Sequence, residues 1–261
     1  MKKIILLSAL CLLSFQARAN DINIDADERV EWYRDEQKIV AIGNAVATKN
    51  TNTLKGNVLT MIYEKVMLEN GEQKNQMQKI LSDGAVRLEV DGANGKGEHF
   101  NYDLPTQTAV LTGSPARLEN ATGEITATGS ITYLGAENKS IAEGDVVAKN
   151  PDYTVYADKM ISYFDTDKQG KKTLNRVEIY AKGKPVKIVN KQSTVTGRRG
   201  VYFPLENKLK IFENVVINQN NDILKGEYAE TDLKTGISRL LAGKNKGSRV
   251  SGVFHNKKKK Q

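Results

Sequence analysis

Apolar and polar side chains alternate along several stretches of this chain. The clearest stretch is 86–91, in which Val86, Leu88 and Val90 alternate with three charged residues. The same alternation appears in four other pairs, namely Ile22 with Ile24, Val177 with Ile179, Leu209 with Ile211 and Val215 with Ile217. A period of two residues is typical of β-strands with one buried face. The sequence therefore predicts an all-β protein, and no segment after the N-terminal leader favours a helix.

Short turn signals separate these stretches and recur at regular intervals. They are Gly43-Asn44, Gly84-Ala85, Gly113-Ser114, Gly144-Asp145, Gly183-Lys184 and Glu213-Asn214. Gly, Asn and Asp tolerate the positive φ that tight turns require. The first three signals precede the last three by 101, 99 and 100 residues, and Tyr63 with Tyr163 and Tyr102 with Tyr202 keep this offset. A unit of roughly a hundred residues is therefore present twice.

A third similarity links the two ends of the chain, because Leu54-Lys55-Gly56-Asn57 recurs 170 residues later as Leu224-Lys225-Gly226-Glu227. Such self-similarity is typical of stacked repeats rather than of an enzyme core. No Pro-rich or Ser-rich linker separates the copies, so we expect one continuous body. Its first unit would span 22–143 and its second 144–243, and 244–261 would form a basic tail without fixed structure. The alternation breaks at Pro115 and Pro185, where it does not assign an inward face.

The N-terminus has the pattern of an export signal. Lys2 and Lys3 precede an apolar run over 4–15, and Ala17-Arg18-Ala19 follows. This pattern predicts a Sec signal peptide that is cleaved after Ala19, and hence a periplasmic protein. The apolar run is shorter than the roughly 20 residues that a membrane span needs. A lipoprotein signal would use Cys11, but Leu10 before it is too large for that processing site.

Removal of the signal changes the composition. Cys11 is the only cysteine, so the mature chain would contain no disulfide, reactive thiol or Cys-ligated metal. The formal net charge of +8 would fall by the three charges of Lys2, Lys3 and Arg18. Four of the remaining positive charges lie at 257–260. That basic run suits either a solvated end or attraction to an anionic surface such as lipid or a phosphorylated sugar.

Candidate catalytic groups are scarce. The chain has two histidines, His99 and His255, too few for chemistry centred on a His triad. Neighbouring strand residues face opposite sides, so Glu98 and His99 would not share a metal, and His99 is expected at the surface. Two carboxylate pairs have the spacing that places both groups on one side of a strand, as a glycosidase needs, but they stand at strand ends or turns. These pairs are Asp25 with Asp27 and Asp165 with Asp167.

Other motifs with a known chemistry are missing from the sequence. It contains no P-loop, no Gly-rich dinucleotide fingerprint and no His-Glu zinc motif. Its basic residues are not interleaved with aromatic residues as on a nucleic-acid platform. We therefore expect no enzyme activity, no cofactor, no metal and no nucleic-acid partner.

Three segments together resemble a known module. Residues 38–46, 109–114 and 157–163 resemble strand-and-turn phrases of the OstA-like family. This module occurs in LptA, the periplasmic lipopolysaccharide-transport protein, in LptC, and in the N-terminal part of LptD. The resemblance covers about 22–241. Each phrase alone is weak, but their number, order and spacing behind an export signal make the match specific.

The resemblance implies a β-jellyroll, a V-shaped, twisted stack of antiparallel strands whose apolar interior carries the acyl chains of lipopolysaccharide. Eight to ten strands per sheet would give a trough on the order of 40 to 50 Å long. The residues expected to line the trough are Ile39, Ala41, Val86, Leu88, Phe100, Tyr102, Val155, Ile161, Leu209 and Ile211. The same pattern also suits a closed core that these side chains simply fill, and both interpretations stay open.

A stack that does not close leaves unpaired backbone groups at both ends, where unlike ends can join head to tail. We expect these edges near 22–26 and 215–233, at Ile22, Ile24, Val215 and Ile217. The resemblance implies lipopolysaccharide as ligand and, as partners, an LptC-like inner-membrane module, an LptD-like outer-membrane module and further copies of this chain. This chain is longer than a single LptA module, and a doubled module would span more distance alone.

Two other classes of function remain. One is a secreted β-helix enzyme that acts on polysaccharide, and it would need acidic residues stacked on one exposed face. The other is a structural repeat protein with a closed core and no ligand. Extractable bound lipid would separate the bridge function, in which lipopolysaccharide passes from the inner to the outer membrane, from both alternatives.

Overall fold

The computed structural model describes residues 22–90, 92–235, 237–243 and 248–255. The expected signal peptide (1–19) and the lysine run at 257–260 lie outside this part. In chain order the strands are β1 (Asn23–Asp25), β2 (Arg29–Tyr33), β3 (Lys38–Lys49), β4 (Asn52–Met67), β5 (Gln73–Val90), β6 (Ala93–Asp103), β7 (Thr108–Thr112), β8 (Ala116–Asn120), β9 (Gly123–Ala127), β10 (Ser130–Leu134), β11 (Lys139–Lys149), β12 (Thr154–Thr166), β13 (Lys172–Tyr180), β14 (Val186–Val189), β15 (Ser193–Gly197), β16 (Arg199–Phe203), β17 (Lys208–Gln219), β18 (Asp222–Asp232), β19 (Ser238–Leu241) and β20 (Ser251–Val253). A short 3-10 turn, η2 (Gly135–Glu137), joins β10 to β11. The expected all-β fold is confirmed.

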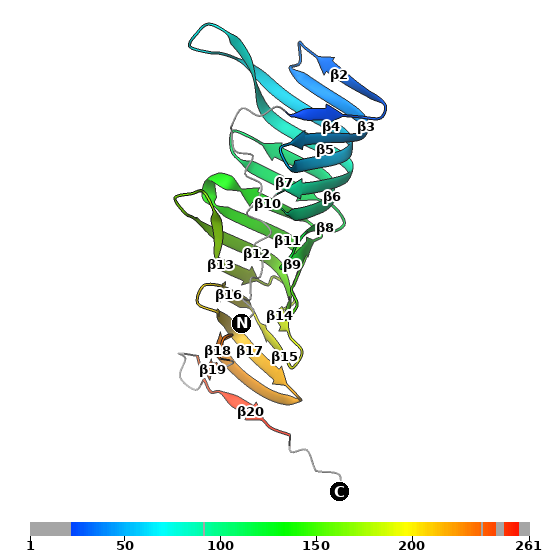
Figure 1. The fold of residues 1–261 in the computed structure, drawn as a ribbon. Helices are drawn as coiled ribbons and strands as arrows, with labels where there is room; N and C mark the ends of the chain where they lie inside the picture. Colours follow the sequence, from blue (N-terminus) through cyan, green and yellow to red (C-terminus); the bar gives the residue numbers. More distant parts are fainter. Residues whose placement is uncertain (1–21, 91, 236, 244–247, 256–261) are drawn as a thin grey trace.

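The strands form one antiparallel hydrogen-bonded sheet that is folded along a line into two halves. Half-sheet 1 has the order β2, β3, β4, β5, β6, β7, β10, β11, β12, β13, β16, β17, β18, β19. Half-sheet 2 has the order β1, β3, β4, β5, β6, β8, β9, β11, β12, β14, β15, β17, β18, β20. Figure 1 shows the resulting elongated stack, with β2 and β20 at opposite ends.

The stack is longer than expected. Within the described residues each half-sheet contains fourteen strand segments, which at about 4.8 Å per strand make a body about 60 Å long. The expectation of eight to ten strands per sheet was wrong because the turn signals were counted as chain reversals. The chain reverses at other places, so it makes more and shorter crossings.

The six Gly-containing or Asn-containing junctions are corners between the half-sheets and not reversals. In β3, Gly43 and Asn44 both have positive φ (88° and 43°), and the strand register skips between Ile42 and Ala45. Junctions within β5, β11 and β17 repeat this bulge, and the remaining two lie between β7 and β8 and between β13 and β14. A bulge of two left-handed residues bends a strand without turning it back. The expectation of positive φ was therefore correct at four junctions and not at Gly113 and Gly183, and the expectation of tight turns was wrong.

The reversals use asparagine turns that the sequence analysis did not single out. Between β8 and β9 the Oδ1 atom of Asn120 accepts hydrogen bonds from the N–H groups of Thr122 (2.8 Å) and Gly123 (3.2 Å). Asn150 and Asn190 accept the same pair of bonds after β11 and β14. An Asn side chain that binds backbone two residues on stabilises such a turn.

Glycine is also needed where strands approach closely at the corner. A Cβ atom on Gly56 would lie 2.1 Å from the Oγ atom of Ser82 on the neighbouring strand. Gly226 occupies the equivalent place in the 170-residue echo, where a Cβ atom would lie 2.8 Å from Leu240. The echo therefore marks a packing requirement of the corner.

The interior between the half-sheets is apolar. Alternate residues of nearly every strand point into it and form one continuous buried cluster. After Pro115, whose peptide bond with Ser114 is cis, Ala116 and Leu118 are buried, and after Pro185 Val186 and Ile188 are buried. The structure therefore assigns the inward face at the two places where the sequence pattern did not.

One of the two tyrosine pairs that are 100 residues apart does not occupy equivalent structural positions. Tyr102 and Tyr202 are both buried, but Tyr63 is buried whereas Tyr163 lies between buried Ser162 and Phe164 and so faces outward. The first corners are 101 residues apart, so the structural equivalent of Tyr63 is Phe164.

Candidate functional site: the apolar interior

Rows of side chains cross the stack from end to end on the inner face. One row of half-sheet 1, which we call row 1, follows the strand register. Its members are Trp32, Ile39, Met61, Ile80, Tyr102, Ala109, Tyr133, Ser140, Ser162, Val177, Tyr202, Leu209, Thr231 and Ser238. A row of this kind gives an apolar ligand a continuous path, interrupted in its middle by two serines.

The residues expected to line the interior are mostly found there. Ile39 is half-buried, between buried Met61 and exposed Trp32 in the row. The others that face the interior are Ala41, Val86, Leu88, Phe100, Tyr102, Val155, Leu209 and Ile211. Their position in the interior says nothing about a bound lipid, so their lipid contact stays a prediction.

The orientation expected for Ile161 was wrong. Ile161 lies between buried Met160 and Ser162 and pairs with Ile141 and Glu178, which are only half-buried. Adjacent strand residues face opposite sides, so Ile161 points outward. Asp158, which the corner leaves out of the ladder, shifts the phase of β12 by one residue, and such a shift exchanges the two faces.

A cavity of about 30 Å³ lies near the C-terminal end and has room for about two water molecules. It is lined by Tyr153, Val155, Ile179, Ile188, Tyr202, Leu209 and Leu233. Burial here raises the pKa of Tyr202 to about 12. An acyl chain would enter this cavity only if the half-sheets moved apart here.

Three buried polar side chains interrupt the apolar interior, and the sequence analysis missed all of them. They are Ser82, Ser140 and Ser162. The hydroxyl of Ser82 donates to the carbonyl oxygen of Lys55 (3.3 Å) beside the corner. The sequence pattern gave no signal for Ser162, because an inward Ile161 would place its neighbour Ser162 on the outer face.

At its N-terminal end the stack is open. β1 and β2 each pair only with β3 among the described strands, so both have a free edge. Ile22 and Ile24 pack against the core as half-buried residues. On β2, Val30 (51 % exposed) and Trp32 (55 %) are exposed. The free edge at this end therefore consists of two strands. β1 lies within the edge expected at 22–26, and β2 was not expected from the sequence.

The C-terminal edge was expected in the wrong place. Val215 and Ile217 are buried in β17, which is paired on one side with β15 and β16 and on the other with β18. The terminal strands are β19 and β20, which pair with β18. β20 lies within 244–261, the segment expected to lack structure. The strand was not expected because its short apolar stretch at 250–254 follows a run of polar residues. Large apolar side chains are exposed at this end, namely Ile237, Leu241, Val250, Val253 and Phe254.

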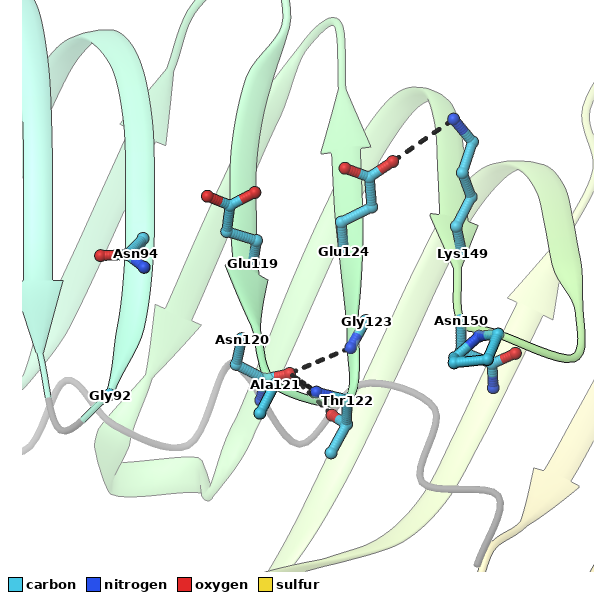
Figure 2. Close-up of a pocket in the computed structure, with 11 residues that line it drawn as sticks. Gly92, Asn94, Glu119, Asn120, Ala121, Thr122, Gly123, Glu124, Lys149 and Asn150 are labelled. Carbon is cyan, nitrogen blue, oxygen red and sulfur yellow. Dashed lines mark hydrogen bonds and ion pairs between the residues drawn. The ribbon is translucent and has the colours of Figure 1, made fainter. Parts of the chain in front are cut away.

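A second hollow, polar and about 530 Å³ in volume, lies along the turns of half-sheet 2. Figure 2 shows Glu124 directed toward Lys149 and Asn120 directed into its own turn. Arg117 pairs with Glu119 (2.5 Å) and Glu124 (2.7 Å), and Lys149 pairs with Glu124 (3.3 Å). These charges balance one another on the outer face, and neither carboxylate is left free as a catalytic acid or base.

Other acidic residues have structural partners. His99 Nδ1 lies 2.7 Å from Asp83 on the exposed face. Asp167 accepts N–H groups within its turn, Asp165 binds the Asn175 amide, and Asp27 binds the Asn44 amide. Within the described ranges no group of three or more His, Cys, Asp and Glu side chains is arranged to hold a metal. The same part of the chain contains no helix that is long and apolar enough to cross a membrane.

The fold and interior define a class of protein: an antiparallel β-stack with an apolar interior and free strand edges at both ends. The family model of the LptA/LptD N-terminal domain, described as a lipopolysaccharide transport protein, matches residues 23–133 and again 124–237. The chain therefore belongs to this family, which confirms the resemblance. The two matches overlap at 124–133, and the unit boundary expected at 143 stays a prediction.

The chain is also similar to solved structures. The chain is similar to LptH from Pseudomonas aeruginosa, described as the LptA homologous periplasmic component of the conserved lipopolysaccharide transport device. The identity is 14% over 91% of this chain and 96% of that chain, and the TM-score is 0.23. No curated protein matches the chain. At this identity and TM-score, the likeness to LptH carries no argument of its own.

Proposed function

We propose that this protein is a non-enzymatic carrier of lipopolysaccharide that holds the acyl chains between its two half-sheets. The observation that supports this most directly is the buried apolar cluster, which extends along the whole stack. Acyl chains need only an apolar surface, which alternating strands supply without a catalytic group. Family membership supports the same conclusion.

The proposal places the protein in the periplasm, after cleavage of the signal behind Ala19. Membership in a lipopolysaccharide transport family supports this location. The free edges of β1 and β2 at one end and of β19 and β20 at the other offer unpaired backbone groups to neighbouring modules. We infer LptC-like and LptD-like modules, or further copies of this chain, as partners in a bridge between the two membranes.

A structural repeat with a closed core is the second candidate. It is favoured by the continuous cluster of buried apolar side chains and by the small volume, about 30 Å³, of the cavity near Tyr202. The two functions differ in whether the half-sheets separate to admit lipid.

Photocrosslinking in living cells tests the carrier function. A benzophenone amino acid at the buried positions Leu88, Tyr102 and Leu209 should give lipopolysaccharide adducts. The exposed neighbours Arg87 and Glu89 are matched controls and should give none. Folded, abundant protein without adducts at any inner position would contradict the carrier function and favour the closed core.

A further inference from the structure

Two serines face each other in the middle of the interior. Ser140 on β11 and Ser162 on β12 are opposite in register, and each is 1 % exposed. Buried Ala142, Met160 and Phe164 share their face. Neither Oγ atom has a hydrogen-bond partner. The stack therefore holds two unpaired hydroxyl groups inside an otherwise apolar row.

Such an arrangement is uncommon, because buried polar groups in folded proteins are nearly always hydrogen-bonded. Ser82 follows that rule, since its hydroxyl reaches the carbonyl oxygen of Lys55 at the corner. An unpaired hydroxyl destabilises the empty protein. The serine pair therefore needs an explanation other than packing.

The repeats of the chain provide an internal comparison. One unit earlier, 101 residues before, the same two positions are Ile39 and Met61, which pair in the same register. The equivalent pair in the later copy, 69 residues after Ser140 and Ser162, is Leu209 with Thr231. The Thr231 hydroxyl lies 3.0 Å from that of Ser238. The fold therefore accepts large apolar residues at this place, and only the middle copy has hydroxyls without partners.

We propose that Ser140 and Ser162 form a hydrogen-bonding subsite for a hydroxylated acyl chain. This proposal depends on the proposed function, in which acyl chains occupy the interior. Each serine hydroxyl donates one hydrogen bond and accepts others, so a chain hydroxyl placed between them satisfies both. An unsubstituted chain leaves both serines unpaired, and a site built to bind a hydroxyl discriminates against the analogue that lacks it.

Calorimetric titration of the purified protein with 3-hydroxymyristate and with myristate tests this subsite. The wild type should bind the hydroxylated chain about fivefold more tightly, as expected for one net hydrogen bond. The double variant Ser140→Ala with Ser162→Ala should bind both chains equally, and its melting temperature should rise. Ser82→Ala is the matched control and should keep the preference, because its hydroxyl already has a backbone partner.

A second variant distinguishes loss of the subsite from loss of folding. Ser140→Ile with Ser162→Met installs the pair that the first unit already accommodates, and it should also lose the preference. A preference that persists in both variants, or a wild type that binds both chains equally, would overturn the subsite and leave the carrier function standing. A wild type that binds neither chain would overturn both proposals.

Discussion

Single residues at the corners decide which way neighbouring side chains point. Asp158 is the clearest case, because it stands outside the ladder of β12 and reverses the inward face on its two sides. Its carboxylate accepts hydrogen bonds from the N–H groups of Lys182 and Gly183 at the adjacent corner. These bonds hold the pKa of Asp158 below its ordinary value of 3.8.

We predict that Asp158→Asn lowers stability in a pH-dependent way. A carboxyl with a lowered folded-state pKa contributes stability above its unfolded pKa and loses it as the pH falls through the folded pKa. The variant should therefore be less stable than the wild type near neutral pH, and the difference should shrink below about pH 4. Urea unfolding followed across this range measures the effect. Asp145→Asn at the facing corner is the control and should change little, and a constant deficit at every pH would contradict the prediction.

The sequence predicted much at the residue scale, and its errors have a common cause. Alternation correctly indicated inward positions such as Val86, Leu88 and Phe100. It failed at Ile161 because the phase was extended across the corner without counting the unpaired Asp158. Which junction residue is unpaired depends on the partner strand, and this information is not local in the sequence.

The corner bulge is the element that shapes this fold. In β3, β5, β11 and β17 its second residue has a positive φ, and this residue is Asn44, Ala85, Asp145 and Asn214, respectively. Asn and Asp visit this conformation more easily than residues without a short polar side chain. Ala85, with φ of 51°, is therefore the least favourable of the four.

We predict that Ala85→Asn stabilises the protein by about 1 kcal/mol, because it relieves left-handed strain. The reverse change at an equivalent corner, Asn214→Ala, should destabilise it by a similar amount. Chemical denaturation of both variants measures the difference. An unchanged or lower stability of Ala85→Asn would contradict the prediction, because it would show that the side chain at this position does not set the free energy of the left-handed backbone at the corner.

Half-sheet 2 also carries like charges on neighbouring strands. Lys55 lies opposite Arg87, and Arg87 lies opposite Lys96, all on the exposed face. Directly opposed like charges are destabilising. We predict that Arg87→Glu raises stability by roughly 0.5 to 1 kcal/mol at low salt and that the gain diminishes as salt screens it. Arg87→Gln should give a smaller gain, and a gain that does not depend on salt would argue against an electrostatic origin.

At the scale of the whole molecule the two ends differ. Exposed Val30 and Trp32 lie at the β2 end, and exposed Val253 and Phe254 lie at the β20 end. Unlike ends that match make head-to-tail contacts, which continue into an open filament. The proposed bridge follows from this asymmetry.

We predict that Val30→Asp and Phe254→Asp each abolish self-association of the protein, because a charge on either end breaks every contact in a filament. A mixture of the two variants should form dimers and nothing larger, since it contains one intact end of each kind. Sedimentation velocity distinguishes these cases. A wild type that stays monomeric at high concentration would contradict self-association, and a mixture that stays monomeric would contradict the head-to-tail arrangement.

Sequence repeats predicted the continuous body but not its length or its C-terminal strands. The repeat unit identified the long strands through their Gly-Asn corners, whereas β7 to β10 are short and have weaker signals. β19 and β20 are short strands that are preceded by polar residues such as Thr235 and Arg249, so the sequence pattern did not predict them. Their pairing depends on the edge of β18, which exists only in the folded stack.

The zigzag path of the chain also determines how the molecule assembles. Within the described part, pairing joins residues that are close in sequence, and even the wide pairing of Thr53 with Glu89 spans 36 positions. Folding is faster when contacts are local, and each new strand of a repeat stack needs only the strand before it. A chain that emerges N-terminus first could therefore add strands to β1, β2 and β3 one after another, before its last residues have appeared.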